Sequence, residues 1–130
     1  LSVIIKEHVR PIYILYEKNI TKKTKLIFVE NPGSNTFDFQ DLGKILSIAK
    51  KNKILTAIDN TWGTPYFLKP IKLGFDMSIV SATKYYSGHS DVMGGSLAVN
   101  KKVFKKIRKN FVRCLAIRTR ALVFIFGNFS

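Results

Sequence analysis

Residues 77–84 read Met-Ser-Ile-Val-Ser-Ala-Thr-Lys and place one lysine just beyond a short apolar run. The stretch 75–80 is mostly apolar and β-rich, which predicts a buried strand. Lys84 follows after two hydroxyl residues, Ser81 and Thr83. Burial disfavours the charged form of an amine, so a lysine held in a closed pocket is a usable nucleophile for a Schiff base. Most lysines in such loops point to water, and Lys84 alone does not decide the function.

A second strand-like stretch, residues 54–63, reads Ile-Leu-Thr-Ala-Ile-Asp-Asn-Thr-Trp-Gly, and its apolar part ends in an acid, Asp59. In an open α/β sheet the ligand crevice lies at the carboxyl ends of parallel strands. Two strands of one such sheet would bring Asp59 and Lys84 to the same edge. Pyridoxal phosphate uses this pair of groups, a lysine for its aldehyde and an acid for its ring nitrogen. The two stretches therefore predict a pyridoxal-phosphate site with Lys84 as its catalytic residue.

The chain resembles the Cys/Met-metabolism family of pyridoxal-phosphate enzymes on these motifs. The matching residues are 58–65, 81–85 and 88–91, and the resemblance extends over residues 24–100. Tryptophan after Asp-Asn-Thr looks more like the bacterial cystathionine β-lyases than the γ-synthases and γ-lyases of the family, which stay the alternative. The resemblance implies an α/β fold: a partial, mostly parallel sheet with flanking helices, like part of the large domain of aspartate-aminotransferase type I enzymes.

The resemblance also implies a role for each candidate side chain. Lys84 holds the cofactor and moves the substrate's Cα proton, while Asp59 keeps the cofactor's ring nitrogen protonated. Further cofactor contacts are expected from four hydroxyl side chains: Ser81 and Thr83 at the phosphate, and Thr61 and Ser34 near the ring. Ordinary alternatives stay open, because strand-end hydroxyls often bond the local backbone and a loop serine often caps a turn. The implied reaction converts cystathionine to homocysteine, pyruvate and ammonia, in a homo-oligomer that binds a small sulfur amino acid.

The flanking sequence supplies the rest of an α/β unit. Residues 26–29 predict a buried parallel strand. A helix capped by Asp38 is expected next, and its apolar face has the spacing i, i+3, i+4 and i+7: Leu42, Ile45, Leu46 and Ala49. Residues 71–74 predict a short turn or helix, 96–99 a further strand of the same sheet, and 101–111 an amphipathic helix.

Three regions follow along the chain. Residues 1–23 form a poorly matched N-terminal segment, in which 3–5 and 12–16 could each be a short strand. Residues 24–111 form a partial pyridoxal-phosphate-binding domain. Residues 112–130 form an unassigned basic and apolar tail.

Several parts of the family's site have no counterpart in these 130 residues. Members of the family are much longer, and they have a ring-stacking tyrosine, a glycine-containing phosphate loop, a Tyr-x-Arg pair from the neighbouring subunit and an arginine for the substrate carboxylate. The sequence starts at Leu1 rather than at a methionine. We therefore expect a truncated remnant with little or no lyase activity, and a complete enzyme of which this is one piece is the competing hypothesis.

The charge of the chain raises nucleic acid as a possible partner. The formal net charge is +14, and the pI is about 10.1. Residues 92–130 contribute +9 of this charge, with no acid among them. No aromatic residues interleave with the basic run as a base-stacking surface requires, and no nucleic-acid motif is present. We therefore expect no nucleic-acid partner, and a non-enzymatic basic binding module is kept as an alternative function.

The cysteine content, the apolar runs and the histidines indicate the cellular compartment and argue against a membrane span and a metal site. A single cysteine, Cys114, permits no internal disulfide and fits a reducing compartment, so we expect a cytoplasmic protein. The apolar run 121–127 is too short to span a membrane, and the first residues do not form a signal peptide. His89 and Asp91 are two ligands without further partners and fall short of a zinc site, so no metal is expected.

Overall fold

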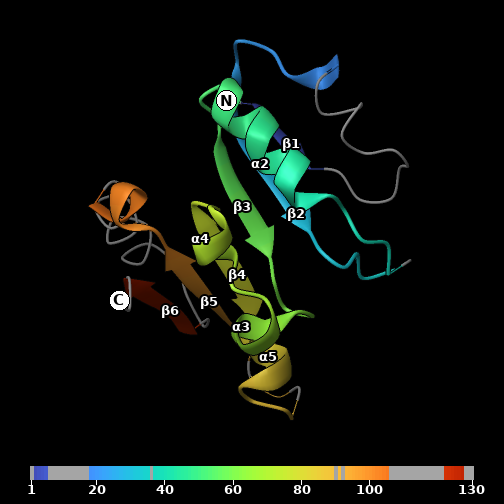
Figure 1. Ribbon diagram of the computed structural model, residues 1–130. Coiled ribbons are helices and arrows are strands. Elements are labelled where there is room, and N and C mark those ends of the chain that lie inside the picture. Colours follow the sequence, from blue (N-terminus) through green and yellow to red (C-terminus); the bar gives the residue numbers. More distant parts are fainter. Residues whose placement is uncertain are drawn as a thin grey trace.

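The computed structural model describes residues 2–5, 18–35, 37–89, 91, 93–105 and 122–127. In these residues the chain forms one six-stranded sheet with strand order β1-β2-β3-β4-β5-β6 (Figure 1). The strands are β1 (Ser2–Ile5), β2 (Thr24–Glu30), β3 (Leu55–Asp59), β4 (Met77–Ser81), β5 (Gly94–Val99) and β6 (Leu122–Gly127). Only the β4–β5 pair is antiparallel among the described strands. The expected mostly parallel α/β sheet is confirmed.

Helices and helical turns connect the strands. They are α2 (Leu42–Lys51), α3 (Thr64–Phe67), α4 (Pro70–Leu73) and α5 (Ala82–Tyr85), followed by a further helical segment at residues 101–105. Figure 1 shows α2 lying across β2 and β3, while α3 and α5 lie near the end of the sheet where β3 and β4 finish. The β2-α2-β3 unit has the parallel pairing that its sequence predicted.

The cap of α2 differs from the prediction. Asp41, not Asp38, is the N-cap residue, and its Oδ1 accepts a hydrogen bond from the backbone N–H of Lys44 at 3.0 Å. An N-cap oxygen must reach an N–H in the first turn, and Asp38 lies too far before Leu42 to do so. Asp38 instead belongs to the preceding loop, where its backbone carbonyl accepts a hydrogen bond from the N–H of Gly33 at 3.1 Å.

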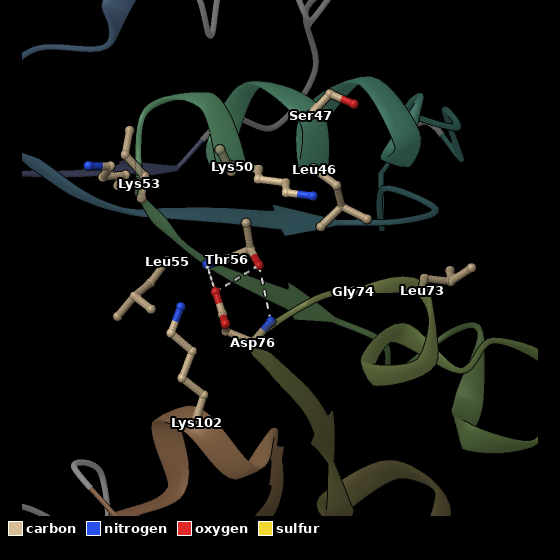
Figure 2. Close-up of a pocket in the computed structure, with 12 residues that line it drawn as sticks. Leu46, Ser47, Lys50, Lys53, Leu55, Thr56, Leu73, Gly74, Asp76 and Lys102 are labelled. Carbon is tan, nitrogen blue, oxygen red and sulfur yellow. Dashed lines mark hydrogen bonds between the residues drawn. The ribbon is translucent and has the colours of Figure 1, made fainter.

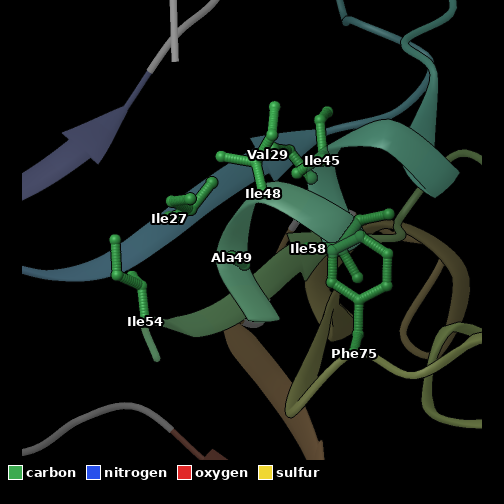
Figure 3. Close-up of a cluster of buried hydrophobic side chains, with 8 residues drawn as sticks. All are labelled: Ile27, Val29, Ile45, Ile48, Ala49, Ile54, Ile58 and Phe75. Atoms are coloured by element: carbon green, nitrogen blue, oxygen red, sulfur yellow. The ribbon is translucent and has the colours of Figure 1, made fainter. Parts of the chain in front are cut away.

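The core lies between α2 and the face of the sheet that this helix covers (Figure 3). Its members come from β2, α2, β3 with the residue just before it, and the segment before β4: Ile27, Val29, Ile45, Ile48, Ala49, Ile54, Ile58 and Phe75. The predicted apolar face of the helix is confirmed, because Ile45 and Ala49 are buried and Leu42 and Leu46 pack against the cluster. Burying such side chains stabilises the fold by roughly 1.5–3 kcal/mol each.

Alternate residues of the same strands face the other side of the sheet. This second face carries mostly half-buried apolar side chains: Leu26, Phe28, Leu55, Met77, Ile79 and Leu97. Asp59 and Ser81 lie on this face, because Asp59 pairs with Ile79 in the β3–β4 register and Ser81 follows Ile79 by two residues. The two residues thus share both a face and an edge of the sheet.

Several sequence predictions concern the ends of the chain. The strand predicted within 3–5 is part of β1, the strand predicted at 96–99 is part of β5, and helix is present at 101–105. Residues 122–127, left unassigned by the sequence, form β6 parallel to β5. The strand considered at 12–16, the remainder of the 101–111 helix and Cys114 lie outside the described residues.

Candidate functional site

The carboxyl ends of β3 and β4 bring the two principal candidate residues to one edge of the sheet. Asp59 is the last residue of β3, and it pairs in parallel with Ile79 of β4. β4 ends two residues later at Ser81, and α5 begins at once and carries Lys84 in its last turn. An acid and an amine therefore leave neighbouring parallel strands at the same edge, where α/β sheets bind their ligands.

The carboxylate of Asp59 is half-buried, and only one of its oxygens is engaged. Its Oδ1 accepts hydrogen bonds from the backbone N–H of Thr61 at 2.9 Å and from the Thr61 hydroxyl at 2.6 Å. Within the described part of the chain, Oδ2 accepts no hydrogen bond. The carboxylate is thus held in a fixed orientation by one oxygen and leaves the other for a ligand.

Thr61 is buried and connects the two strand ends. Its hydroxyl donates to Asp59 and accepts a hydrogen bond from the backbone N–H of Ser81 at 2.9 Å. The position near the cofactor ring stays a prediction, and the hydroxyl proton of Thr61 is committed to Asp59. The bond from the Thr61 N–H to the carboxylate two residues earlier is an Asx-turn, and an aspartate at a strand end is a sequence signal for it.

The two hydroxyls predicted at the phosphate have different surroundings. Ser81 is half-buried, and its hydroxyl makes no hydrogen bond to the other described residues. The hydroxyl of Thr83 donates to the carbonyl of Gly94 at 3.2 Å and accepts from the N–H of Gly94 at 2.9 Å, which ties α5 to the start of β5. Ser81 is therefore free to donate to a phosphate, whereas Thr83 would first have to exchange its bond to Gly94.

Lys84 is exposed, so the described structure does not enclose its amine in a pocket. The side chain forms no ion pair or hydrogen bond with any described residue. α5 is a single turn that follows directly on β4, at the rim of the sheet. In the described structure the amine is therefore accessible to a ligand.

Ser34 lies in the loop that follows β2, at the same edge. Its N–H and its hydroxyl both donate to Oε2 of Glu30, at 3.2 and 3.1 Å. Glu30 ends β2 and is the register partner of Asp59. In the present arrangement Ser34 acts as a loop hydroxyl, one of the two interpretations of this residue that the sequence left open.

Exposed aromatic and apolar side chains gather in the segments that adjoin this edge. They follow β2, β3 and β4 or precede the antiparallel β5: Phe37, Phe39, Trp62, Tyr66, Phe67, Tyr85, Tyr86 and Met93. Phe37 and Trp62 pack edge to face with their ring centroids 5.0 Å apart. Large apolar side chains exposed together mark a surface that binds a ligand or another protein segment. We refer to these eight residues as the apolar rim.

Asn60 was missed by the sequence reasoning, although it fixes the turn after Asp59. It is fully buried, its backbone N–H donates to the carbonyl of Ile79 at 2.8 Å, and its side-chain Nδ2 donates to the carbonyl of Leu68 at 3.0 Å. Its Oδ1 is buried without a hydrogen-bond partner in the described structure. A Cβ at Gly63 would lie 2.5 Å from this oxygen, so the turn requires glycine there.

A cleft of about 540 Å³ lies at the opposite edge of the sheet (Figure 2). It is bordered by α2, the end of α4, the start of β3 and the helical segment 101–105. Lys50, Lys53 and Lys102 line it. Its one acid, Asp76, has both oxygens occupied: Oδ1 accepts from Asn100 at 2.7 Å, and Oδ2 accepts from the Thr56 N–H at 3.0 Å and hydroxyl at 3.3 Å. This acid serves the fold, and the cleft holds no pair of a free acid and an amine nucleophile of the kind found at the other edge.

Comparison with known proteins identifies the family. The family model for Cys/Met metabolism PLP-dependent enzymes matches residues 11–117. The chain belongs to this family. The matched range includes both motifs and extends beyond the 24–100 stretch on which the resemblance was recognised. Pyridoxal phosphate is therefore the cofactor of the family to which the chain belongs.

Individual relatives agree with this assignment. A cystathionine β-lyase from Coxiella burnetii is 43% identical over 91 residues, which are 68% of this chain and 24% of the relative. An L-alanine/L-glutamate racemase from Wolbachia pipientis is 38% identical over 92 residues, which are 71% of this chain and 23% of the relative. The chain thus spans about a quarter of the length of these curated relatives.

A solved structure shares the fold. It is a protein from Campylobacter jejuni assigned as an O-acetylhomoserine (thiol)-lyase, with 41% sequence identity and a TM-score of 0.57. The match covers 62% of this chain and 20% of that protein, whose structure contains a pyridoxyl-lysine phosphate group. The comparison supports the expected fold, that of a pyridoxal-phosphate-dependent enzyme domain.

Among the described residues, no group of three or more His, Cys, Asp or Glu side chains could hold a metal ion. None of the helices described is long and apolar enough to cross a membrane.

Proposed function

We propose that this chain is part of the cofactor domain of a pyridoxal-phosphate-dependent carbon–sulfur lyase that resembles cystathionine β-lyase. The observation that carries the proposal is the arrangement at the carboxyl edge of β3 and β4. There, one oxygen of Asp59 is held by Thr61 and the other is open, and the amine of Lys84 lies at the same edge without a partner in the described structure. These are the two groups that the cofactor requires.

The residues present fit the cofactor at three points. The amine of Lys84 is accessible for attachment of the cofactor aldehyde. The open oxygen of Asp59 can accept a hydrogen bond from the protonated ring nitrogen, while the Ser81 hydroxyl can donate to the phosphate. When bound, the cofactor supplies an electron sink for the charge that develops at the substrate's Cα atom. Lys84 would be the base that removes and returns the Cα proton.

We place the reaction among eliminations from small sulfur amino acids, with cystathionine as the expected substrate. The motif Asp-Asn-Thr-Trp favours β-elimination, which would give homocysteine, pyruvate and ammonia, while γ-elimination is the alternative within the same family. The relatives named above act as a lyase and as a racemase, and both reactions begin with removal of the Cα proton. The described residues therefore support removal of the Cα proton, the step that both reactions share. β-Elimination is the more specific part of the proposal.

The state of the working protein belongs to the same proposal. We expect a cytoplasmic homo-oligomer whose further residues close the apolar rim and bind the substrate carboxylate. On its own the 130-residue chain should attach the cofactor but release little pyruvate, because the described residues include no arginine that could hold the substrate carboxylate. A non-enzymatic basic binding module stays the alternative, supported only by the charge of +14.

The test is attachment of the cofactor to Lys84. The chain is incubated with pyridoxal phosphate and reduced with borohydride, and the adduct is located by peptide mass spectrometry. We expect a stable pyridoxyl group on Lys84 in the unchanged chain and none at this position in Lys84→Ala. Lys72→Ala is the matched control, since Lys72 is also exposed but lies in α4. A folded chain whose adducts are spread evenly over its surface lysines would contradict the proposal and favour the binding module.

A further inference from the structure

We infer that Thr61 is a positioning residue that couples the acid of β3 to the strand that delivers the lysine. The inference rests on the proposed function, since it concerns how Asp59 and Lys84 are held relative to each other. It assigns Thr61 an action through these two elements, in addition to the position near the cofactor ring that the sequence predicted.

The directions of the hydrogen bonds around Thr61 are determined by chemistry. The backbone N–H of Ser81 can only donate, so the Thr61 oxygen accepts from it at 2.9 Å. The hydroxyl proton must then point elsewhere, and the ionised carboxylate of Asp59, 2.6 Å away, can only accept it. The result is a chain from N–H to hydroxyl to carboxylate in which each bond polarises the next.

The hydrogen bonds of the Thr61 hydroxyl connect β3 and β4 beyond the point where their pairing in the sheet ends. The last registered pair of β3 and β4 is Asp59 with Ile79. After this pair, β3 is followed by the turn 60–63, while β4 continues through Ser81 into α5. The two segments of the chain therefore separate. The Thr61 side chain bridges them at this point. It is 5% exposed, which leaves little room for water to replace the lost bonds.

The same link decides which oxygen of Asp59 meets the cofactor. Thr61 supplies two donors to Oδ1 through its N–H and its hydroxyl, so the carboxylate cannot rotate without breaking both bonds. Oδ2 is then the oxygen presented to a ring nitrogen. Without the hydroxyl, one donor remains to orient the carboxylate, and the tie to the lysine strand is lost.

The chain contains a natural control for this inference. Thr56, at the other end of β3, makes the same kind of bridge to Asp76, which lies just before β4. Its hydroxyl donates to Oδ2 of Asp76 at 3.3 Å and accepts from the Asp76 N–H at 3.1 Å, and its side chain is 2% exposed. Loss of this bridge would weaken the same pair of strands without touching the edge that carries Lys84.

The experiment compares Thr61→Val, Thr61→Ser and Thr56→Val in the 130-residue chain. Valine has the shape of threonine without the hydroxyl, and serine restores it. The first measurement is the pyridoxal-phosphate concentration that gives half-maximal borohydride-stable adduct on Lys84. The second is the pH midpoint of the visible absorbance change of the attached cofactor. Unfolding midpoints in urea are measured for each variant, and all adduct measurements are made well below them.

For Thr61→Val we expect about a tenfold weaker attachment, which corresponds to the loss of one charge-assisted hydrogen bond. The absorbance midpoint should move to higher pH, because a less well oriented Asp59 holds less positive charge on the ring and the attached nitrogen then keeps its proton more firmly. Thr61→Ser should restore both values to within about twofold. Thr56→Val should lower the unfolding midpoint at least as much as Thr61→Val, with attachment and absorbance unchanged.

Two results would overturn the inference, and they differ from failure of the proposed function. Equal loss of attachment in Thr61→Val and Thr56→Val would mean that the hydroxyl acts only on stability. Unchanged attachment and absorbance in Thr61→Val, with a normal adduct on Lys84, would remove the positioning role while the proposed function stands. Absence of an adduct on Lys84 in the unchanged chain would instead remove the proposed function and, with it, the positioning role.

Discussion

The two ends of the β3–β4 pair have similar residues and different bonding. At the amino end Thr56 bridges to Asp76, and at the carboxyl end Thr61 bridges Asp59 to Ser81. Within the described residues Asp76 has both oxygens bonded, whereas Asp59 has one. An acid whose oxygens are all satisfied by its own chain stabilises the fold, and an acid left with an open oxygen is available to a ligand. The hydrogen bonds thus assign Asp76 to the fold and support the proposal that Asp59 meets the cofactor.

The largest expected effect is a loss of Cα-proton exchange when Asp59, at the carboxyl end of β3, is replaced. Asp59→Asn keeps an oxygen that can accept both donors of Thr61, so the unfolding free energy should change by less than about 0.5 kcal/mol. The charge that keeps the cofactor's ring nitrogen protonated is lost, and cofactor-dependent exchange of the Cα proton of L-alanine in heavy water should fall by about a hundredfold or more. Proton NMR follows the exchange, with free pyridoxal phosphate as the background. Unchanged exchange would remove Asp59 from the site.

The same substitution at the amino end should have the opposite pattern. Asp76→Asn has only one oxygen, so it cannot accept from both Asn100 and Thr56, and one buried donor loses its partner. We expect a loss of about 1–3 kcal/mol in the free energy of unfolding, measured by urea titration. Attachment of the cofactor to Lys84 should stay the same in the folded variant. A selective loss of attachment at full stability would mean that the two ends do not differ as the hydrogen bonds indicate.

Two glycine substitutions compare the turn after Asp59 with the helix α2. Gly63→Ala should cost about 1–3 kcal/mol, because the new Cβ would lie 2.5 Å from the buried Oδ1 of Asn60 and 3.0 Å from Cβ of Leu68. Gly43→Ala in α2 is the matched variant, since its Cβ would meet only Oδ1 of Asp41, at 3.4 Å. Alanine in a helix should stabilise by about 0.5–1 kcal/mol. Equal unfolding midpoints for the two variants would contradict the tight turn described after Asp59.

The smallest expected effect concerns Asp41, the N-cap residue of α2. The hydrogen bond from the Lys44 backbone N–H holds the pKa of Asp41 below its usual value. A lowered folded-state pKa means that the stabilisation is present above the unfolded-state pKa and is lost as the pH falls through the folded-state pKa. Asp41→Ala should therefore lower the melting temperature slightly at neutral pH, with the difference from the unchanged chain disappearing in acid. Asp41→Asn, which still caps α2, should show little change at either pH.

Patterns within single elements allowed much of the fold to be predicted. Apolar runs located β2, β3 and β4, and helical spacing identified the face of α2 that is buried. The order of strand, helix and strand predicted the parallel pairing, and the positions of Asp59 and Lys84 after their strands predicted a shared edge. The cap of α2 was wrongly placed because two aspartates precede the helix, and only the bond to Lys44 decides between them.

The hydrogen bonds of the site could not be predicted in the same way. Thr61 and Ser81 are twenty residues apart, as are Thr56 and Asp76, and their bonds depend on the register between two strands. The bond between Thr83 and Gly94 depends on where the antiparallel β5 begins. The exposure of Lys84 was left open, because sequence shows which residue follows a strand but not what encloses it. The individual roles of the hydroxyls therefore required the three-dimensional structure.

The spatial order of the six described strands is the same as their order along the chain. Each described strand can therefore pair with the strand made just before it as the chain leaves the ribosome. This topology makes the sheet suited to growing step by step during synthesis, from its first strand to its last.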